Sequence, residues 1–363
     1  MTRQLFVADR RSIEAWRIAV AREREAYEVV RADGGPEWRR VAPEAGERWA
    51  LDDVPLPLVG PKRFFFPERE VLVRWRGDAA DDRAPEPAPF ALLGVRPCDL
   101  TAIAMLDRFF ADDGAYRARR ACGLVIGVNC ASACSGGFCR DVDAGPFATA
   151  GFDVDLTVLS DDRIAVEIAT AAGEDSLAAA GVELRPASAH LRCELARARA
   201  AAESTCRPHP FVARAIARVE GGIGAPPILR DEWAALSNRC LACTGCTSLC
   251  PTCTCFTVCD EGIRERDERG RPVAGARVRS WDSCLLEGFQ REASGHHPAP
   301  EPGDRLRRFW THKLARGFDR CDRIACVGCG RCDVTCPGSI GGLRGLAALA
   351  GPGPAPRAAG ARP

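Results

Sequence analysis

The sequence has little lysine, little histidine and no long apolar run. Lysine and arginine together number 50 against 49 acidic residues, which leaves a net charge of +1, and Lys62 and Lys313 are the only lysines. A balanced charge gives no electrostatic reason to expect nucleic acid as a partner. No apolar run approaches the roughly 18 residues that would span a bilayer, so we expect no membrane span. We attribute the scarcity of lysine to the base composition of the genome rather than to function.

Sequence motifs for nucleotide binding and for hydrolysis are also missing. No G-x-G-x-x-G follows an expected strand, and G-x4-G-K-[ST] does not occur. The five histidines are scattered, apart from the adjacent His296 and His297, and there is no Ser/His/Asp signature. The sequence therefore offers no recognisable dinucleotide site and no hydrolytic centre.

Cysteine, by contrast, is abundant, with 20 residues. The first residues do not resemble a signal peptide, so we expect a cytoplasmic protein. In that reducing compartment structural disulfides are rare. The abundance of cysteine therefore points to metal ligation.

Two cysteine runs share the spacing C-x2-C-x2-C-x3-C-P, which is typical of [4Fe–4S] ferredoxins. In two-cluster ferredoxins the fourth cysteine of each run ligates the other cluster. We therefore predict two [4Fe–4S] clusters with crossed ligands. The first would be held by Cys240, Cys243, Cys246 and Cys336, and the second by Cys326, Cys329, Cys332 and Cys250. The alternative is a pair of zinc knuckles, which typically set two C-x2-C pairs well apart.

The remaining sequence predicts an α+β multidomain fold. An amphipathic helix is expected over residues 12–30, where Trp16 and Tyr27 share one face. Short apolar segments alternate with a helix further on and predict a sheet with helices packed on it. The expected strands are 71–75, 90–95, 123–128, 152–159 and 163–168, and the expected helix is 100–110.

Composition divides the chain into parts. Residues 1–220 are expected to form an N-terminal α/β domain with a surface loop at 77–88. A glycine- and proline-rich hinge at 221–227 precedes an α-helical dicluster ferredoxin domain at 228–345, with a long insertion between its two cysteine runs. Residues 346–363 are expected to be a disordered tail.

Four further cysteines lie in the N-terminal half. Cys98 and Cys130 each follow an expected strand, and ligands gather at strand carboxyl ends in α/β sheets. Together with Cys134 and Cys139 they form either a third cluster site or a set of unliganded thiols. Cys122, Cys193 and Cys206 show no spacing pattern, and we interpret them as core or surface thiols.

Longer motifs resemble a known family. The segments concerned are Pro61-Lys-Arg-Phe-Phe-Phe-Pro67, Gly94-Val-Arg-Pro-Cys-Asp-Leu-Thr-Ala-Ile103, Cys250-Pro-Thr-Cys-Thr-Cys-Phe, Trp281-Asp-Ser-Cys284, His312-Lys313 and Cys326-Val-Gly-Cys-Gly-Arg-Cys. Over roughly residues 60–345 they resemble the iron–sulfur β subunit of cytosolic nickel–iron sulfhydrogenases. The A subunit of anaerobic sulfite reductases is built similarly.

The resemblance implies an electron-transfer subunit that holds neither nickel–iron nor sirohaem. Its partners would be a flavin- and NAD(P)-binding reductase subunit and a catalytic hydrogenase or sulfite reductase subunit. The segments around Cys98 and Cys130 also faintly resemble the β subunit of deazaflavin-reducing hydrogenases, which holds a cluster beside a flavin. A flavin-dependent reductase with its own N-terminal flavin site is therefore an open alternative.

The insertion between the runs carries cysteines of its own. Cys253, Cys255 and Cys284 match the family pattern, and they are either extra metal ligands or buried thiols that pack beside the clusters. The roles of Cys259 and Cys321 stay open. Basic residues before the second run are interpreted as a solvated helix face, a docking surface for an acidic partner, or cations that raise a cluster potential. They are Arg305, Arg307, Arg308, Lys313, Arg316, Arg320 and Arg323.

Overall fold

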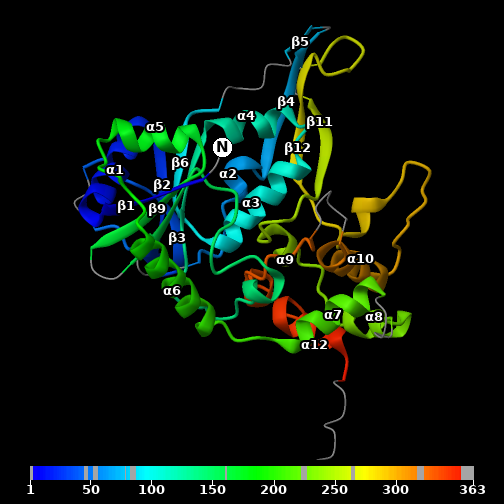
Figure 1. Ribbon diagram of the computed structural model, residues 1–363. Coiled ribbons are helices and arrows are strands. Elements are labelled where there is room, and N and C mark those ends of the chain that lie inside the picture. The colour runs from blue at the N-terminus through cyan, green and yellow to red at the C-terminus, as the bar shows by residue number, and fades with distance from the viewer. Residues whose placement is uncertain are drawn as a thin grey trace, which may run out of the picture.

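The structure is a computed structural model that describes residues 3–44, 48–51, 56–77, 79–81, 87–159, 162–221, 227–262, 266–316 and 323–352. Two sheets and a group of helices make up this part of the chain (Figure 1), so the expected α+β class is confirmed. Across these ranges, no helix combines the length and the apolar character needed to cross a membrane.

A mixed eight-stranded sheet organises the N-terminal half, in the order β10-β1-β9-β8-β7-β6-β2-β3. Neighbours from β2 to β8 pair in parallel, and the remaining pairs are antiparallel. The strand bounds are β1 (Gln4–Asp9), β2 (Glu25–Ala32), β3 (Gly35–Arg40), β6 (Phe90–Val95), β7 (Gly123–Val128), β8 (Val154–Val158), β9 (Arg163–Ile168) and β10 (Arg185–Pro186). β6 and β7 are buried over their whole length, as central parallel strands must be.

Helices cover both faces of this sheet. α1 (Arg10–Glu23) and α5 (Ala171–Ala179) pack on the face that carries Leu93 and Ile126. α3 (Pro97–Phe109) and α4 (Gly114–Cys122) pack on the opposite face, which carries Leu92 and Val125. Because side chains alternate along a strand, each central strand feeds two hydrophobic cores.

The strands expected at 90–95, 123–128 and 163–168 and the helix at 100–110 are confirmed. The helix expected over residues 12–30 is wrong in its second half, because α1 ends at Glu23 and β2 follows. Asp9 caps its start by accepting a hydrogen bond from the Ser12 backbone at 2.8 Å. Arg24 then adopts an extended conformation, and Tyr27 pairs with Leu92 of β6. Parallel pairing with a buried strand outweighs the weak helical periodicity there.

A second sheet joins distant parts of the chain in the order β11-β12-β4-β5. β4 (Arg69–Arg76) and β5 (Ala79–Asp81) come from the N-terminal half, whereas β11 (Phe256–Gly262) and β12 (Ala274–Trp281) come from the insertion. The strand expected at 71–75 is thus confirmed as β4, but it pairs with β12 rather than with the large sheet. β5 also interrupts the loop expected at 77–88, of which residues 78 and 82–86 lie outside the described residues.

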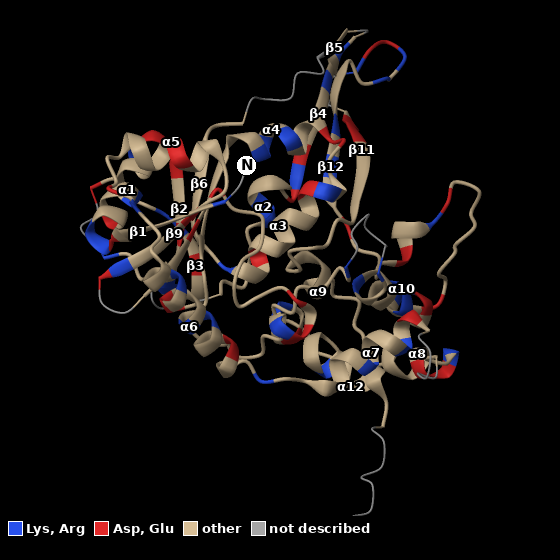
Figure 2. Cartoon of the chain, in the orientation of Figure 1, with Lys and Arg blue, Asp and Glu red and all other residues tan. Residues whose placement is uncertain are grey.

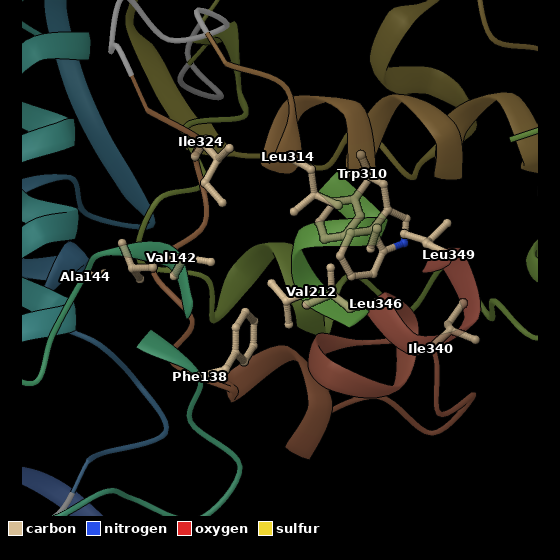
Figure 3. Packing of buried hydrophobic residues seen from close by; sticks show 14 of the residues in the cluster. Phe138, Val142, Ala144, Val212, Trp310, Leu314, Ile324, Ile340, Leu346 and Leu349 are labelled. Carbon is tan, nitrogen blue, oxygen red and sulfur yellow. The ribbon is translucent and has the colours of Figure 1, made fainter. Parts of the chain in front are cut away.

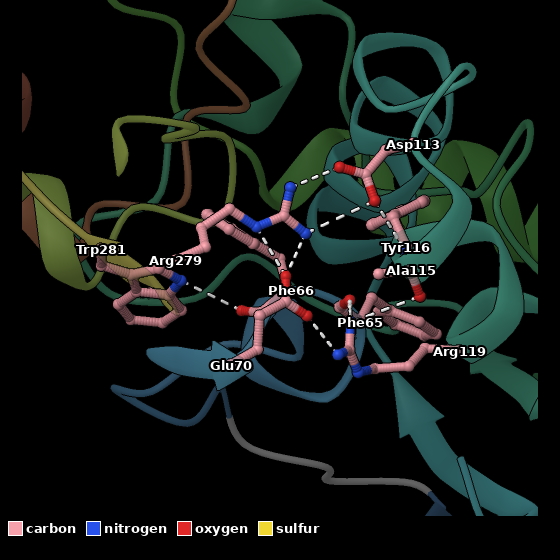
Figure 4. A network of polar contacts seen from close by, with 9 residues as sticks. All are labelled: Phe65, Phe66, Glu70, Asp113, Ala115, Tyr116, Arg119, Arg279 and Trp281. Carbon is pink, nitrogen blue, oxygen red and sulfur yellow. Dashed lines mark hydrogen bonds and ion pairs between the residues drawn. The ribbon is translucent and has the colours of Figure 1, made fainter. Parts of the chain in front are cut away.

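A buried charge network fixes β12 to the N-terminal half (Figure 4). The Arg279 guanidinium donates to the Glu70 carboxylate at 2.6 Å and also forms an ion pair with Asp113. Arg119 forms a further ion pair with Glu70, and the Trp281 indole donates to the Phe66 carbonyl at 3.1 Å. The insertion is therefore an integral part of the fold rather than a separate appendage.

The C-terminal helices gather below the sheets in the view of Figure 1. They are α7 (Pro210–Glu220), α8 (Arg230–Ser237), α9 (Gly245–Ser248), α10 (Pro302–Leu314), α11 (Arg331–Val334) and α12 (Gly342–Ala350), reached through the long α6 (Ala189–Thr205). One hydrophobic core joins them to the N-terminal half (Figure 3): Phe138 and Val142 lie in the same cluster as Val212, Trp310 and Leu346.

This shared core includes residues on both sides of two boundaries expected from the sequence, the hinge at 221–227 and the start of the tail at 346. α7 precedes the hinge expected at 221–227 yet packs on α10 and α12; residues 222–226 of that hinge lie outside the described residues. α12 runs through the expected start of the tail at 346, because Leu346 and Leu349 are buried in the core. The rest of the expected tail, residues 353–363, lies outside the described residues.

Candidate metal centres

A first cavity brings both cysteine runs together. It is lined by the sulfur-bearing residues Cys240, Cys243, Cys246 and Cys336. Its empty volume is about 430 Å³, and its walls include Leu285, Leu306, Phe309 and Ile340. The last cysteine of the second run therefore lies with the first three of the first run. The walls of this cavity are largely apolar, and Cys243 and Leu241 are exposed at its mouth.

A second cavity of almost the same empty volume, about 450 Å³, lies beside the first. It is lined by Cys250, Cys326, Cys329 and Cys332, together with Phe138, Trp310 and Lys313. Cys246 and Phe309 line both cavities, so the two are immediate neighbours. Cys336 thus lies in the first lining and Cys250 in the second, as the crossed arrangement requires, and the ligation itself stays a prediction.

The two runs also share a local backbone conformation. Ala242 and Thr244 have φ values of 48° and 62°, and the corresponding Gly328 and Gly330 have 62° and 76°. A short helix lies within each run and contains its third cysteine, α9 in the first and α11 in the second. Gly328 is required in the second run, because a Cβ there would lie 2.6 Å from the Phe138 backbone. The two runs therefore share one loop conformation.

Backbone N–H groups point at several of these sulfurs. Gly342 donates to Cys332 at 3.1 Å, and Ile340 donates to Cys336 at 3.4 Å. Hydrogen bonds to cluster sulfurs stabilise the more negative state and so raise a cluster potential. Burial raises the pKa of Cys326 to about 12 and that of Cys329 to about 11.

Cys250 differs from the other lining thiols. The hydrogen bond from the Cys253 thiol, helped by the Lys313 charge, lowers the pKa of Cys250 well below its ordinary value. Lys313 lies on α10 and donates to the Thr252 carbonyl at 3.2 Å. Lys62 begins the short helix α2 (Lys62–Phe65) and donates to the Cys253 carbonyl at 3.3 Å.

Both lysines of the chain are thus buried beside the second cavity, each with 4 % of its surface exposed. From the sequence, the scarcity of lysine is attributed to genome composition, and no role at the site is predicted for Lys62. The available signal was that the two remaining lysines both fall in motifs shared with a known family.

The basic residues before the second run do not form one surface. Lys313 is buried, and Arg323 donates to the Val142 carbonyl at 2.6 Å. Arg307 and Arg308 are exposed, and Arg320 lies outside the described residues. Figure 2 shows acidic and basic residues interspersed along the described chain.

The insertion cysteines lie in two thiol pairs beside the cavities. Cys253 is hydrogen-bonded to Cys250, and the hydrogen bond from Cys284 lowers the pKa of Cys255 to about 6. Among the described residues, the linings of the two cavities do not include Cys253, Cys255 or Cys284. Cys259 is exposed on β11, and Cys321 lies outside the described residues.

The N-terminal cysteines come from two segments. Cys98 is buried in the first turn of α3, where Asp99, Cys329 and Cys139 are among the groups acting on its thiol. Cys130, Cys134 and Cys139 lie in the loop after β7, and their electrostatic partners include Cys206 at the end of α6. The structure therefore brings Cys206 close to these three cysteines, although the sequence gave no reason to group it with them.

Zinc knuckles and clusters place their thiolates differently. Thiolates around one zinc would be only about 3.8 Å apart, given a Zn–S distance of roughly 2.3 Å. A cubane cluster instead binds each thiolate to a different iron, which sets the sulfurs further apart. Within the described ranges, no three His, Cys, Asp or Glu side chains form a group that could hold a single ion.

A buried ion pair ties the second run to the large sheet's helical layer. The Arg331 guanidinium, between Cys329 and Cys332, donates to both Asp99 carboxylate oxygens at 2.5 and 2.7 Å. The two side chains are 2 % and 1 % exposed. Arg331 also donates to the Pro57 carbonyl at 2.8 Å. Arg331, in the middle of the second run, therefore fixes this run to the N-terminal half of the chain.

Comparisons with known proteins agree with this site. Residues 239–340 match the family model of a 4Fe-4S dicluster domain. Sulfhydrogenase 2 subunit beta of Pyrococcus furiosus is 28 % identical over 298 residues, which cover 78 % of this chain and 80 % of that protein. No solved structure matches the chain. The chain therefore carries a 4Fe-4S dicluster domain over residues 239–340, and most of its length is similar to a sulfhydrogenase β subunit.

Proposed function

We propose that this chain relays electrons through two [4Fe–4S] clusters as a subunit of a sulfhydrogenase-like complex. The observation that carries the proposal is the pair of adjoining cavities, each lined by cysteines of both runs, with Cys336 in the first lining and Cys250 in the second. Cys240, Cys243, Cys246 and Cys336 would hold one cluster, and Cys326, Cys329, Cys332 and Cys250 the other. Bound clusters would supply one-electron exchange, for which no general acid or base is needed.

The residues of the chain would set how that exchange proceeds. Phe309 and Cys246 line both cavities, which keeps the two centres adjacent. The cavity walls are largely apolar, and the backbone N–H groups of Ile340 and Gly342 hydrogen-bond to sulfurs of the lining cysteines. Burial, hydrogen bonding and local charge are the means by which a protein tunes a cluster.

The proposed partner subunits rest on the similar protein and not on the geometry of the two cavities. The similar protein is named a subunit of a sulfhydrogenase. We propose a flavin- and NAD(P)-binding reductase subunit on one side of the relay and a catalytic hydrogenase subunit on the other, in the cytoplasm. Anaerobic purification of the tagged chain from its host should recover a nickel–iron hydrogenase subunit. Recovery of a sirohaem sulfite reductase instead would contradict this choice of partner.

The isolated chain, reconstituted anaerobically with iron and sulfide, is expected to accept electrons from dithionite without catalysis. Its visible absorption should bleach on reduction, while hydrogen evolution and sulfite reduction should stay at background. The reason is that the proposed ligands serve one-electron exchange, and no catalytic motif was recognised in the sequence. Steady turnover of either substrate by the pure chain would show that it is an enzyme in its own right.

Replacing Lys313 by methionine is expected to lower the potential of one cluster. A unit charge roughly 6–10 Å away contributes about 1.7–2.8 kcal/mol at an effective dielectric of about 20, or roughly 70–120 mV for one electron. Removing a cation disfavours the reduced, more negative state, so the shift is negative. A redox titration followed by electron paramagnetic resonance measures it.

Arg308→Met is the matched control, because Arg308 is exposed on the same helix α10. Solvent screening should keep its effect well below that of Lys313→Met. Equal shifts in the two variants would mean that the buried position of Lys313 has no special influence on the cluster.

A further inference from the structure

A third group of cysteines lies outside the two cavities, where the loop after β7 meets the end of α6. Figure 1 shows α6 descending from the large sheet toward α7 and α12. The Ala133 backbone donates to the Thr205 hydroxyl at 2.8 Å, and the Arg140 guanidinium donates to the Glu203 carbonyl at 2.9 Å. Cys206 follows directly as the C-cap of α6. These bonds hold Cys206 against the loop that carries Cys130, Cys134 and Cys139.

Glycines make room for the thiols of that loop. The Cys130 backbone donates to the Pro146 carbonyl at 3.1 Å, and a Cβ on the neighbouring Gly145 would lie 2.9 Å from the Cys139 sulfur. Gly137 leaves room for the Cys134 sulfur, which a Cβ there would approach to 2.5 Å. The turn from 130 to 146 therefore gathers its three cysteines in one compact loop, against which the end of α6 is bonded.

Two cations accompany these thiols. Arg96 donates to the carbonyls of Val128 and Asn129 at 3.2 Å, and its charge acts on the Cys130 thiol. The Arg140 charge acts in the same way on Cys206. A group of four thiolates around iron carries excess negative charge, which these guanidiniums would offset.

The loop that carries Cys130, Cys134 and Cys139 also packs against the second cysteine run. The Phe138 backbone donates to the Gly328 carbonyl at 2.7 Å, and Phe138 itself lines the second cavity. Cys139 is the next residue along the chain. A centre at the four thiols would therefore be separated from the second cavity by little more than one aromatic side chain. Cys134 is exposed, so the same centre would also be open to an electron donor outside the chain.

We propose that Cys130, Cys134, Cys139 and Cys206 hold a third [4Fe–4S] cluster that extends the relay into the N-terminal half. The ligand pattern repeats that of the other two sites, with three cysteines from one loop and the fourth from a distant segment. Cys206 takes the place that sequence spacing gave to Cys98. This inference rests on the proposed relay function, but it can fail while the two-cluster relay stands.

Iron analysis of the anaerobically reconstituted full chain tests the proposal. We expect about 12 iron atoms per wild-type chain, and about 8 in both Cys206→Ser and Cys130→Ser. Cys98→Ser should keep about 12, as should Cys193→Ser, which lies about 20 Å up α6 at 1.5 Å per residue. A wild-type count near 8 would overturn the third cluster alone, and a count near zero would overturn the relay. Loss of iron in Cys98→Ser but not in Cys206→Ser would overturn the choice of ligand.

Thiol alkylation gives an independent measurement that needs no variant. Cys134 and Cys193 are both exposed, so both should react with iodoacetamide in the iron-free chain. In the iron-loaded chain Cys193 should still react, whereas ligation should slow Cys134 at least tenfold. Equal labelling of the two cysteines in the loaded chain would contradict the proposed site.

Discussion

Replacing Cys336 by alanine should destroy the cluster of the first cysteine run and spare that of the second. Cys336 lines the cavity formed by Cys240, Cys243 and Cys246, although it belongs to the other run. Iron content should fall by about four atoms per chain, the content of one cubane. Cys250→Ala should cause the same loss for the complementary reason, since Cys250 lines the second cavity.

Pairs of substitutions separate crossed from uncrossed ligation. If ligation is crossed, Cys336→Ala combined with Cys240→Ala affects one cluster and removes about four iron atoms. Cys336→Ala combined with Cys326→Ala then affects two clusters and removes about eight. The differences from wild type are compared, so a third cluster does not disturb the test. The opposite result for the two pairs would mean that each run encloses its own cluster.

Asp99→Ala should be among the most destabilising single substitutions in the protein. It leaves the Arg331 guanidinium buried without its carboxylate, and breaking a buried ion pair in this way typically costs about 3–5 kcal/mol. We expect a much lower denaturation midpoint under anaerobic conditions. Because Arg331 sits between Cys329 and Cys332, the second cluster should also be lost first on dilution into denaturant.

An exposed pair provides the control for this prediction. Asp260 forms an ion pair with Arg277, and both side chains are more than half exposed. Asp260→Ala should cost less than about 1 kcal/mol. The double variant Asp99→Leu with Arg331→Met should recover much of the lost stability, because apolar residues of similar volume often replace buried ion pairs well. If Asp99→Ala is no more destabilising than Asp260→Ala, the buried pair does not secure the second run.

The sequence predicted the parts of the site that depend on local spacing. C-x2-C-x2-C-x3-C-P describes one loop, and the same loop geometry recurs at Ala242 and Gly328. The central strands were equally accessible, because β6 and β7 are apolar throughout. In each case the cause of the structure lies within a few consecutive residues.

The features that sequence reasoning missed depend on residues far apart in the chain. Cys206 follows no spacing pattern and joins its loop only through the packing of α6. Lys62 lies beside Cys253 because α2 meets the segment that directly follows the first run. β4 has the composition of any half-buried strand, and nothing local distinguishes β12 from β6 as its partner. Such pairings are fixed by the whole fold rather than by propensity.

The sheet shared by β4 and β12 limits how this protein can be divided or inherited. A gene segment for residues 228–345 alone would encode both cysteine runs and the strands β11 and β12. It would lack β4, so one edge of β12 would be unpaired, and an unpaired strand edge invites aggregation. The same segment would also carry Arg331 without Asp99. The dicluster region is therefore not a module that recombination can transplant like a free-standing ferredoxin, and the two halves must be transmitted together.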